Sequence, residues 1–273
     1  MKNILHVILI LLFSLTVNSC AKKSDTSSTT TSSPLYISVG DNGTILTSSD
    51  GTTWTSRTSG VTEKLYGVTY ANSTFVVVGA TGTILTSSDG TTWTSRTSGT
   101  SNYLYGVTYS NSTFVVAGDN GTILTSSDGI TWTSRTSGTT QSMSGLTFGN
   151  STFVAVGGSD TGIDNGTILT SSDGTTWTTK TSGATYAYWG IIYGNSTFVT
   201  VGPSGSIFTS SDGTTWTSRT SGITNHIWGV TYGNSTFVTV SYGGDILTSS
   251  DGISWTSRTS GTTNILYDVT YKE

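Results

Sequence analysis

The sequence predicts an all-β protein, a six-bladed β-propeller built from four-stranded antiparallel blades. Three observations support this: a sixfold repeat, a strand pattern inside each repeat, and complementary ends of the array. The segment Ser-Ser-Asp-Gly-x-x-Trp occurs six times, and successive copies are 39 residues apart except for one interval of 45. A period near 40 residues indicates one supersecondary unit copied along the chain.

Each repeat divides into four strands, A to D. In the second repeat we expect them at residues 65–70, 74–79, 83–88 and 93–98, all rich in β-branched and aromatic residues. Asn-Ser-Thr segments separate A from B, and links such as Asp119-Asn120-Gly121 separate B from C. Asn-Gly is a strong hairpin signal. No part of the repeat region carries a helical period.

The two ends of the array predict how the ring closes. Residues 35–40 align with strand B, so the first blade lacks a strand A, whereas residues 266–271 read as a strand A with nothing after it. We therefore predict that the C-terminal strand A pairs with the N-terminal strands B, C and D. An open stack would leave unpaired edges. The alternative, a β-solenoid, predicts a single repeating rung and no complementary termini.

The first 34 residues predict export and anchoring. Lys2 precedes an apolar run at residues 4–12, which is the layout of a signal peptide. The ending Val-Asn-Ser-Cys20 resembles the lipobox of bacterial lipoproteins, and this resemblance implies lipidation of Cys20, the only cysteine. We expect a leader at 1–19, a lipidated Ser/Thr-rich tether at 20–34 and a propeller at 35–273, on the outer membrane or cell surface. Plain secretion with an incidental cysteine is the alternative.

The recurring Asp-Gly-x-x-Trp turn is best explained as scaffold. An Asp side chain can accept backbone N–H bonds within its own turn, the Gly permits a left-handed conformation, and the Trp covers the end of the blade. Repetition in every blade argues against metal binding. We interpret these residues as structural: Asp50, Asp89, Asp128, Asp173, Asp212, Asp251, Trp54, Trp93, Trp132, Trp177, Trp216 and Trp255.

Ser-Ser-Asp-Gly-Thr-Thr-Trp resembles the Asp-box, or BNR, repeat of sialidase-type and photosystem II assembly factor-like propellers, with one residue fewer between Gly and Trp. The resemblance covers residues 35–273. It implies the propeller fold and, through the assembly factors, a scaffolding or assembly role. It implies little about activity, because the motif is mainly structural in these proteins.

Positions that differ among the near-identical repeats predict where function resides. They gather in the D–A and B–C links, which a four-stranded meander brings to one rim of the ring. We expect a ligand-binding rim there, because rigid aromatics with a polar tip suit recognition; loop drift without function is the alternative. The candidate residues are Glu63, Tyr66, Tyr103, Tyr105, Tyr186, Tyr188, Trp189, His226, Trp228, Tyr242, Tyr267 and Asp268.

One group of polar residues within this set is expected to lie close together. Asp268 replaces the glycine that the other strands A carry, and His226 and Glu63-Lys64 precede the two neighbouring strands A. We expect these side chains near one side of the channel mouth. A catalytic role is one reading, and a polar contact to a ligand or relaxation near the chain end is another.

Composition and motifs argue against several classes of function. With 11 Lys+Arg against 15 Asp+Glu the chain is acidic, and no basic stripe suits nucleic acid. The arginines recur on the outer strand D, so they cannot form the arginine triad that a sialidase resemblance would require. No metal-ligand spacing, phosphate loop or cofactor motif appears.

We predict a non-enzymatic, monomeric cell-envelope lipoprotein that binds a protein or glycan partner on the rim and needs no cofactor. It touches the membrane only through its lipid. The alternative is a carbohydrate-active enzyme of sialidase-like or glycoside hydrolase type, with paired carboxylates among Glu63, Asp245 and Asp268.

Overall fold

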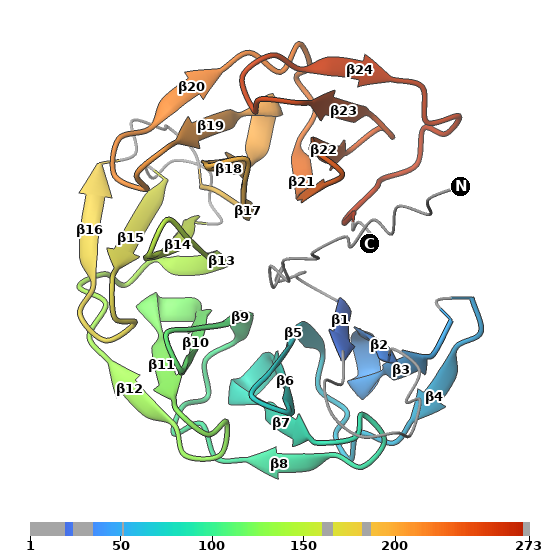
Figure 1. Ribbon diagram of the computed structural model, residues 1–273, viewed down its shortest axis with the longest axis vertical. Helices are drawn as coiled ribbons and strands as arrows, with labels where there is room; N and C mark the ends of the chain where they lie inside the picture. The colour runs from blue at the N-terminus through green and yellow to red at the C-terminus, as the bar shows by residue number, and fades with distance from the viewer. Residues whose placement is uncertain (1–19, 24–34, 51, 160–165, 182–186, 270–273) are drawn as a thin grey trace, which may run out of the picture.

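In the computed structural model, six four-stranded antiparallel sheets stand around a central channel (Figure 1). The structure describes residues 20–23, 35–50, 52–159, 166–181 and 187–269. The predicted leader and most of the tether lie outside these residues. The strand class and the number of blades predicted from the repeat are confirmed. Among the described residues, no helix is long and apolar enough to cross a membrane.

The first three blades follow the chain in order from the innermost to the outermost strand. Blade 1 contains β1 (Cys20–Lys23), β2 (Leu35–Val39), β3 (Ile45–Ser48) and β4 (Thr55–Arg57). Blade 2 contains β5 (Leu65–Ala71), β6 (Thr74–Gly79), β7 (Ile84–Ser87) and β8 (Thr94–Arg96). Blade 3 contains β9 (Leu104–Ser110), β10 (Thr113–Gly118), β11 (Ile123–Ser126) and β12 (Thr133–Arg135).

The other three blades repeat this order. Blade 4 contains β13 (Ser142–Gly149), β14 (Thr152–Gly158), β15 (Thr167–Ser171) and β16 (Thr178–Thr181). Blade 5 contains β17 (Gly190–Gly194), β18 (Thr197–Val201), β19 (Ile207–Ser210) and β20 (Thr217–Arg219). Blade 6 contains β21 (Ile227–Gly233), β22 (Thr236–Ser241), β23 (Ile246–Ser249) and β24 (Thr256–Arg258). In blades 1, 2, 3 and 5 the link between the second and third strands forms a short 3-10 turn: η1 (Asp41–Gly43), η2 (Ala80–Gly82), η3 (Asp119–Gly121) and η4 (Pro203–Gly205).

The A–B turns show why Asn-Ser recurs. In blade 2, Asn72 and Ser73 have φ of 47° and 57°, and the other four Asn-Ser pairs match them. A two-residue hairpin with both central residues at positive φ has the twist of the strands it joins, and Asn tolerates that conformation well. The prediction that these segments are tight turns is confirmed.

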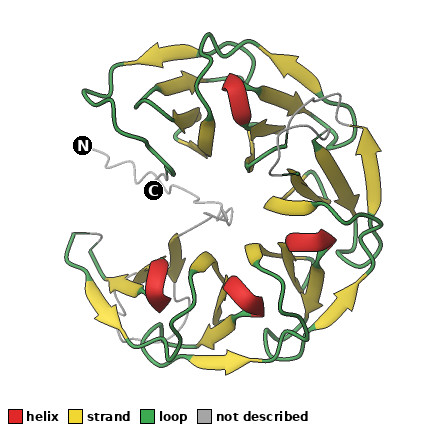
Figure 2. Ribbon diagram, turned by 180° about the vertical axis from the view of Figure 1, so that it is seen from behind, coloured by secondary structure: helices red, strands yellow, loops and turns green. Residues whose placement is uncertain are grey.

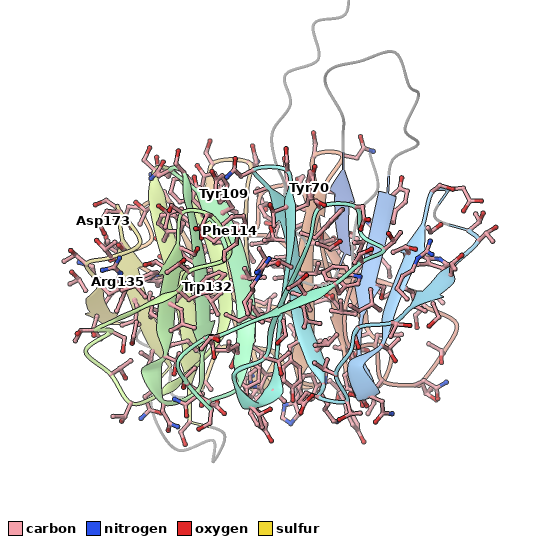
Figure 3. The ribbon with its side chains drawn as sticks, turned by 90° about the horizontal axis from the view of Figure 1, so that it is seen from below. Tyr70, Tyr109, Phe114, Trp132, Arg135 and Asp173 are labelled. Carbon is pink, nitrogen blue, oxygen red and sulfur yellow. The ribbon has the colours of Figure 1, made fainter. Side chains whose placement is uncertain are left out.

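The core lies between neighbouring blades. Each strand B carries an aromatic residue near its start, and the five phenylalanines at this position are fully buried: Phe75, Phe114, Phe153, Phe198 and Phe237. Phe114 packs against Tyr109 on one side, with ring centroids 4.5 Å apart, and Trp132 on the other, at 6.4 Å. Figure 3 shows Phe114 between Tyr109 and Trp132. In blades 2, 3, 5 and 6 the tryptophan after the Asp-Gly turn therefore packs on the phenylalanine of strand B.

The Asp-Gly-x-x-Trp turns are self-contained hydrogen-bonded units. In blade 2, Oδ1 of Asp89 accepts bonds from the backbone N–H groups of Thr91 at 2.7 Å and Thr92 at 2.9 Å. Trp93 donates its indole N–H to the Gly90 carbonyl. The backbone donors of Thr92 and Thr91 hold the pKa of the Asp89 carboxyl well below its usual range. The carboxylate is engaged inside its own turn, which supports a structural role.

Blade 1 differs from the prediction. The edge of β2 that we assigned to residues 266–271 pairs instead with β1, which places Cys20 opposite Ser38 and Lys22 opposite Tyr36. Cys20–Lys23, the first residues of the predicted tether, thus form a strand, and the rest of the tether lies outside the described residues. Ladder bonds are made by the backbone, so a polar segment only eleven residues upstream of β2 can occupy an open edge.

Residues 266–269 form no strand, but they lie beside β21 where the innermost strand of a following blade would lie (Figure 1). Leu266 donates its N–H to the Ser241 carbonyl at 3.1 Å, as Leu65 does to Gly40 at 3.0 Å. A Cβ on Gly229 would lie 3.0 Å from the Tyr267 carbonyl, as one on Gly67 would lie 2.7 Å from that of Tyr105. The C-terminal segment thus keeps the repeat register without joining the sheet of blade 1.

Candidate functional site

Hydrogen bonds join the D–A and B–C links to each other around one rim of the ring. The glycine N–H at the end of a B–C link donates to a carbonyl of the following D–A link: Gly43 to Glu63, Gly82 to Asn102 and Gly121 to Gln141, each at 2.8 Å. The four 3-10 turns of the B–C links lie around the face seen in Figure 2. The predicted convergence of these links on one rim is confirmed.

The A–B and C–D turns form the opposite rim. The Asn111 side chain of an A–B turn donates to the carbonyl of Ser172, which precedes Asp173 in the C–D turn of the next blade, at 3.2 Å. Asn150 and Asn195 make the same contact with Ser211 and Ser250. The turns that do not vary therefore fasten neighbouring blades together, and the variable links are on the other side.

Superposing the repeats gives one equivalent position at the channel mouth of each junction, one residue before the glycine of strand A. The side chains at this position are aromatic except in blade 4: Tyr66, Tyr105, Ser144, Trp189, Trp228 and Tyr267. These six residues, which we name the mouth ring, are partly exposed or exposed, whereas the residue before each one packs into the sheet core in blades 2 to 6.

Three tyrosines form the first aromatic cluster, over blades 2 and 3. The ring of Tyr66 lies 5.2 Å from that of Tyr105 and 6.2 Å from that of Tyr103. Lys64 forms an ion pair with Asp41, the first residue of η1, at 3.4 Å. Burial raises the pKa of the Tyr66 hydroxyl; the Lys64 ammonium opposes this, while Tyr103 and the carboxylates of Asp41 and Asp119 add to it.

The second aromatic cluster spans blades 5 and 6 and the C-terminal segment. Trp189 and Trp228 stack with centroids 4.2 Å apart and an interplanar angle of 13°, and Tyr267 lies 5.8 Å from Trp228. His226 meets Trp189 edge-on at 5.4 Å, and its Nδ1 accepts the N–H of Ser204 at 3.0 Å. The indole N–H of Trp228 is buried and has no acceptor among the described residues.

Tyr188 does not belong to the rim. It is fully buried between blades 4 and 5, edge-on to Phe208 at 5.5 Å. Its place in the repeat is that of Leu65 and Leu104, two residues before the strand A glycine, and such residues face the core. This position in the repeat could have identified Tyr188 as a core residue from the sequence. Tyr186 lies outside the described residues, and Tyr242, in the B–C link of blade 6, is 49% exposed.

The residues of the predicted group, His226, Asp268 and Glu63, each have a hydrogen-bond partner on their own or a neighbouring link. His226 is held by Ser204 and Trp189, while Glu63 accepts the N–H of Thr62 and Asp268 that of Val269. Among the residues that the structure describes, no three His, Cys, Asp or Glu side chains come together as metal ligands would. Each arginine donates its Nε to a threonine of the adjacent strand C at 2.8 Å, so the arginines stay on the outer strands.

The prediction from sequence omitted two carboxylates of this rim, Asp41 and Asp119. Both open a B–C turn of the sequence Asp-Asn-Gly, which read only as a hairpin signal. Asp119 accepts the hydroxyl of Ser142 at 2.7 Å, and its own N–H donates to the Tyr103 carbonyl at 2.8 Å. Asp245 accepts bonds from Asn225 and Ser241. The rim thus combines aromatic faces with oriented carboxylates.

Comparison with known proteins identifies the architecture. No protein-family model and no curated protein matches the chain. Solved structures do match: YCF48 bound to D1 peptide, with TM-score 0.67 and 17% identity over 89% of this chain and 80% of that one. The chain has the β-propeller fold. YCF48 from Cyanidioschyzon merolae matches with TM-score 0.68 and 17% identity, over 92% and 89% of the two chains.

The computationally designed Ika8 protein also matches, with TM-score 0.64 and 13% identity over 95% of this chain and 92% of that one. At these identities the comparisons establish the fold alone. The use that this chain makes of its rim has to be argued from its own residues.

Proposed function

We propose that this protein is a non-enzymatic binding scaffold of the bacterial cell envelope, which holds a protein partner on the D–A/B–C rim. The mouth ring is the observation that carries the proposal. Five of its six equivalent positions are aromatic, although these links vary most among otherwise near-identical repeats. Aromatic residues offer large contact areas at low entropic cost, which is why they dominate binding surfaces.

Two further features support a protein partner. The aromatic side chains remain accessible, with Tyr103 41% and Tyr267 63% exposed, although apolar rings are normally buried when nothing binds them. A structural neighbour of the same fold has been solved with a bound peptide. The arginines and the Asp-Gly turns are engaged in intramolecular bonds, which leaves recognition to the variable rim.

Site-specific photo-crosslinking in the native host tests this function. A photoreactive phenylalanine analogue at Tyr103 should yield a discrete crosslinked protein, whereas the same analogue at Ile130, which is also exposed but on the opposite rim, should not. Adding Tyr66→Ala and Tyr105→Ala should reduce the Tyr103 product at least about tenfold, since each buried aromatic contact contributes about 1–2 kcal/mol. Equal products at Tyr103 and Ile130 would contradict the proposal, and a product destroyed by glycosidases would identify a glycan instead.

The anchor is a separate part of the proposal. We propose that Cys20, the first residue of β1, carries the lipid that attaches the protein to a membrane. Cells fed radioactive palmitate should label the wild-type protein and not the Cys20→Ala variant, and the variant should leave the membrane fraction. Equal labelling of both proteins would refute lipidation at this residue. Matched amounts of a Ser19→Ala protein serve as a control for expression.

A further inference from the structure

The mouth ring has one gap. Ser144 of blade 4 stands where the other junctions carry Tyr or Trp, and its strand β13 packs between β9, which bears Tyr105, and β17, which follows Trp189 directly. Elsewhere in the mouth ring, adjacent aromatic side chains are in contact. The ring centroids of Tyr66 and Tyr105 lie 5.2 Å apart, and those of Trp189 and Trp228 lie 4.2 Å apart. The serine therefore leaves the mouth ring without an aromatic side chain between the positions of Tyr105 and Trp189.

A carboxylate stands beside this gap. Asp119 opens η3, which packs against β13, and it accepts the hydroxyl of Ser142, two residues before Ser144. The equivalent place between blades 1 and 2 holds Asp41, whose carboxylate pairs with the Lys64 ammonium at 3.4 Å. Ser142 replaces that lysine at the blade 4 junction, and no cation of the described residues pairs with Asp119 there. Of these two equivalent carboxylates, Asp41 is thus paired with a lysine of the protein itself, and Asp119 is not.

The charge of the whole rim favours a cationic ligand. Its described D–A and B–C links carry the carboxylates of Asp41, Glu63, Asp119 and Asp245, against the single ammonium of Lys64. The arginines are held on outer strands by their threonine partners. A cation approaching the channel mouth is attracted by these carboxylates, and a lysine or arginine can also be held over an aromatic face.

We propose that the gap at Ser144 binds an arginine side chain of the partner protein, with the guanidinium lying between Tyr105 and Trp189 and paired with Asp119. This inference rests on the proposed binding function and specifies what the rim recognises. A guanidinium suits the site better than an ammonium, because it is planar, stacks on aromatic faces and pairs with carboxylates through two parallel N–H groups. It would take the place of the missing sixth ring.

Binding of short peptides to the purified full chain tests the proposal directly. The probe is N-acetyl-Gly-Arg-Gly-amide, followed by NMR of the tryptophan indole N–H signals. Its matched controls are the lysine peptide and the citrulline peptide, the latter having the same planar shape without charge. The arginine peptide should shift the Trp189 signal and bind about tenfold more tightly than citrulline, which corresponds to the loss of one cation–π contact and one charged pair.

Two variants locate the site. Ser144→Trp should complete the mouth ring and abolish the shift of the Trp189 signal, and Asp119→Asn should weaken arginine binding about fivefold to tenfold and reduce its dependence on salt. Ile130→Ala, an exposed position on the opposite rim, should leave the affinity within about twofold. Thermal melting and the remaining indole signals show whether each variant is folded.

Equal binding of the arginine and citrulline peptides, or unchanged binding by Ser144→Trp, would overturn the arginine site. The proposed function has its own criterion, because the Tyr103 crosslink can persist in Ser144→Trp while the peptide does not bind. In that outcome the rim still holds a protein and the arginine site is wrong. If Ser144→Trp lost both the Tyr103 crosslink and peptide binding, the arginine site would be part of the surface that holds the partner.

Discussion

Gly121→Ala is expected to lower the free energy of unfolding by about 3 kcal/mol. Gly121 has φ of +65°, and a Cβ there would lie 2.0 Å from the Thr139 carbonyl oxygen and 2.7 Å from Oγ of Ser137. The alanine would strain the left-handed backbone and push the D–A link away, which also stretches the bond from the Gly121 N–H to Gln141. Urea unfolding monitored by tryptophan fluorescence measures the loss.

Two glycines provide matched controls for this experiment. Gly138 has φ of +78° with nothing within 4 Å of a Cβ, so Gly138→Ala should cost only the backbone term, about 1 kcal/mol. Gly40 is extended and equally open, so Gly40→Ala should change stability by less than about 0.5 kcal/mol. If Gly121→Ala cost no more than Gly138→Ala, the close contact between the two links would be refuted.

Phe114→Ala is expected to cost about 3–5 kcal/mol, the usual range for a large side chain removed from a packed core. Phe114 is fully buried and is enclosed by Tyr109 and Trp132 and by the Gly129 turn above it. Gly129 and Trp132 are held by hydrogen bonds within the Asp-Gly-x-x-Trp turn, so they cannot collapse into the cavity. The change in urea midpoint gives the free energy at constant slope.

Ile130→Ala is the matched control for the core prediction. Ile130 follows Gly129 in the same turn, but it is 50% exposed. Its removal should change the free energy of unfolding by less than about 0.5 kcal/mol. A loss below 1.5 kcal/mol for Phe114→Ala would show that the phenylalanine layer relaxes, contrary to the packing described above.

Local periodicity predicted most of the fold. The Asp-Gly-x-x-Trp turns, the Asn-Ser turns and the strands each depend on neighbours within a few positions. The structure contains turns and strands at these places. The placement of the D–A and B–C links on one rim followed from the meander connection of each blade. The Asn-Ser turns illustrate the reason: two residues at positive φ suffice to reverse a strand whatever surrounds them.

The candidate site was predicted only in part. Tyr66, Trp189 and Trp228 lie on the rim as expected, but Tyr188, beside Trp189 in the chain, belongs to the core. A shift of one residue reverses the direction of a side chain in a strand. Asp119 escaped notice because an Asp-Asn-Gly segment reads as a turn, and only the fold of the link against Ser142 gives its carboxylate a place beside the mouth ring.

From its sequence alone, this protein is determined to be a ring of six similar β-sheet units with variable links on one side. Those features come from a repeated pattern that each unit satisfies within itself or with the next one. Only the tertiary structure decided which segment pairs with the edge of β2 and which ring positions lie beside a carboxylate. Backbone edges accept any extended segment, and contacts between distant links depend on how whole blades pack, so neither is encoded in a local pattern.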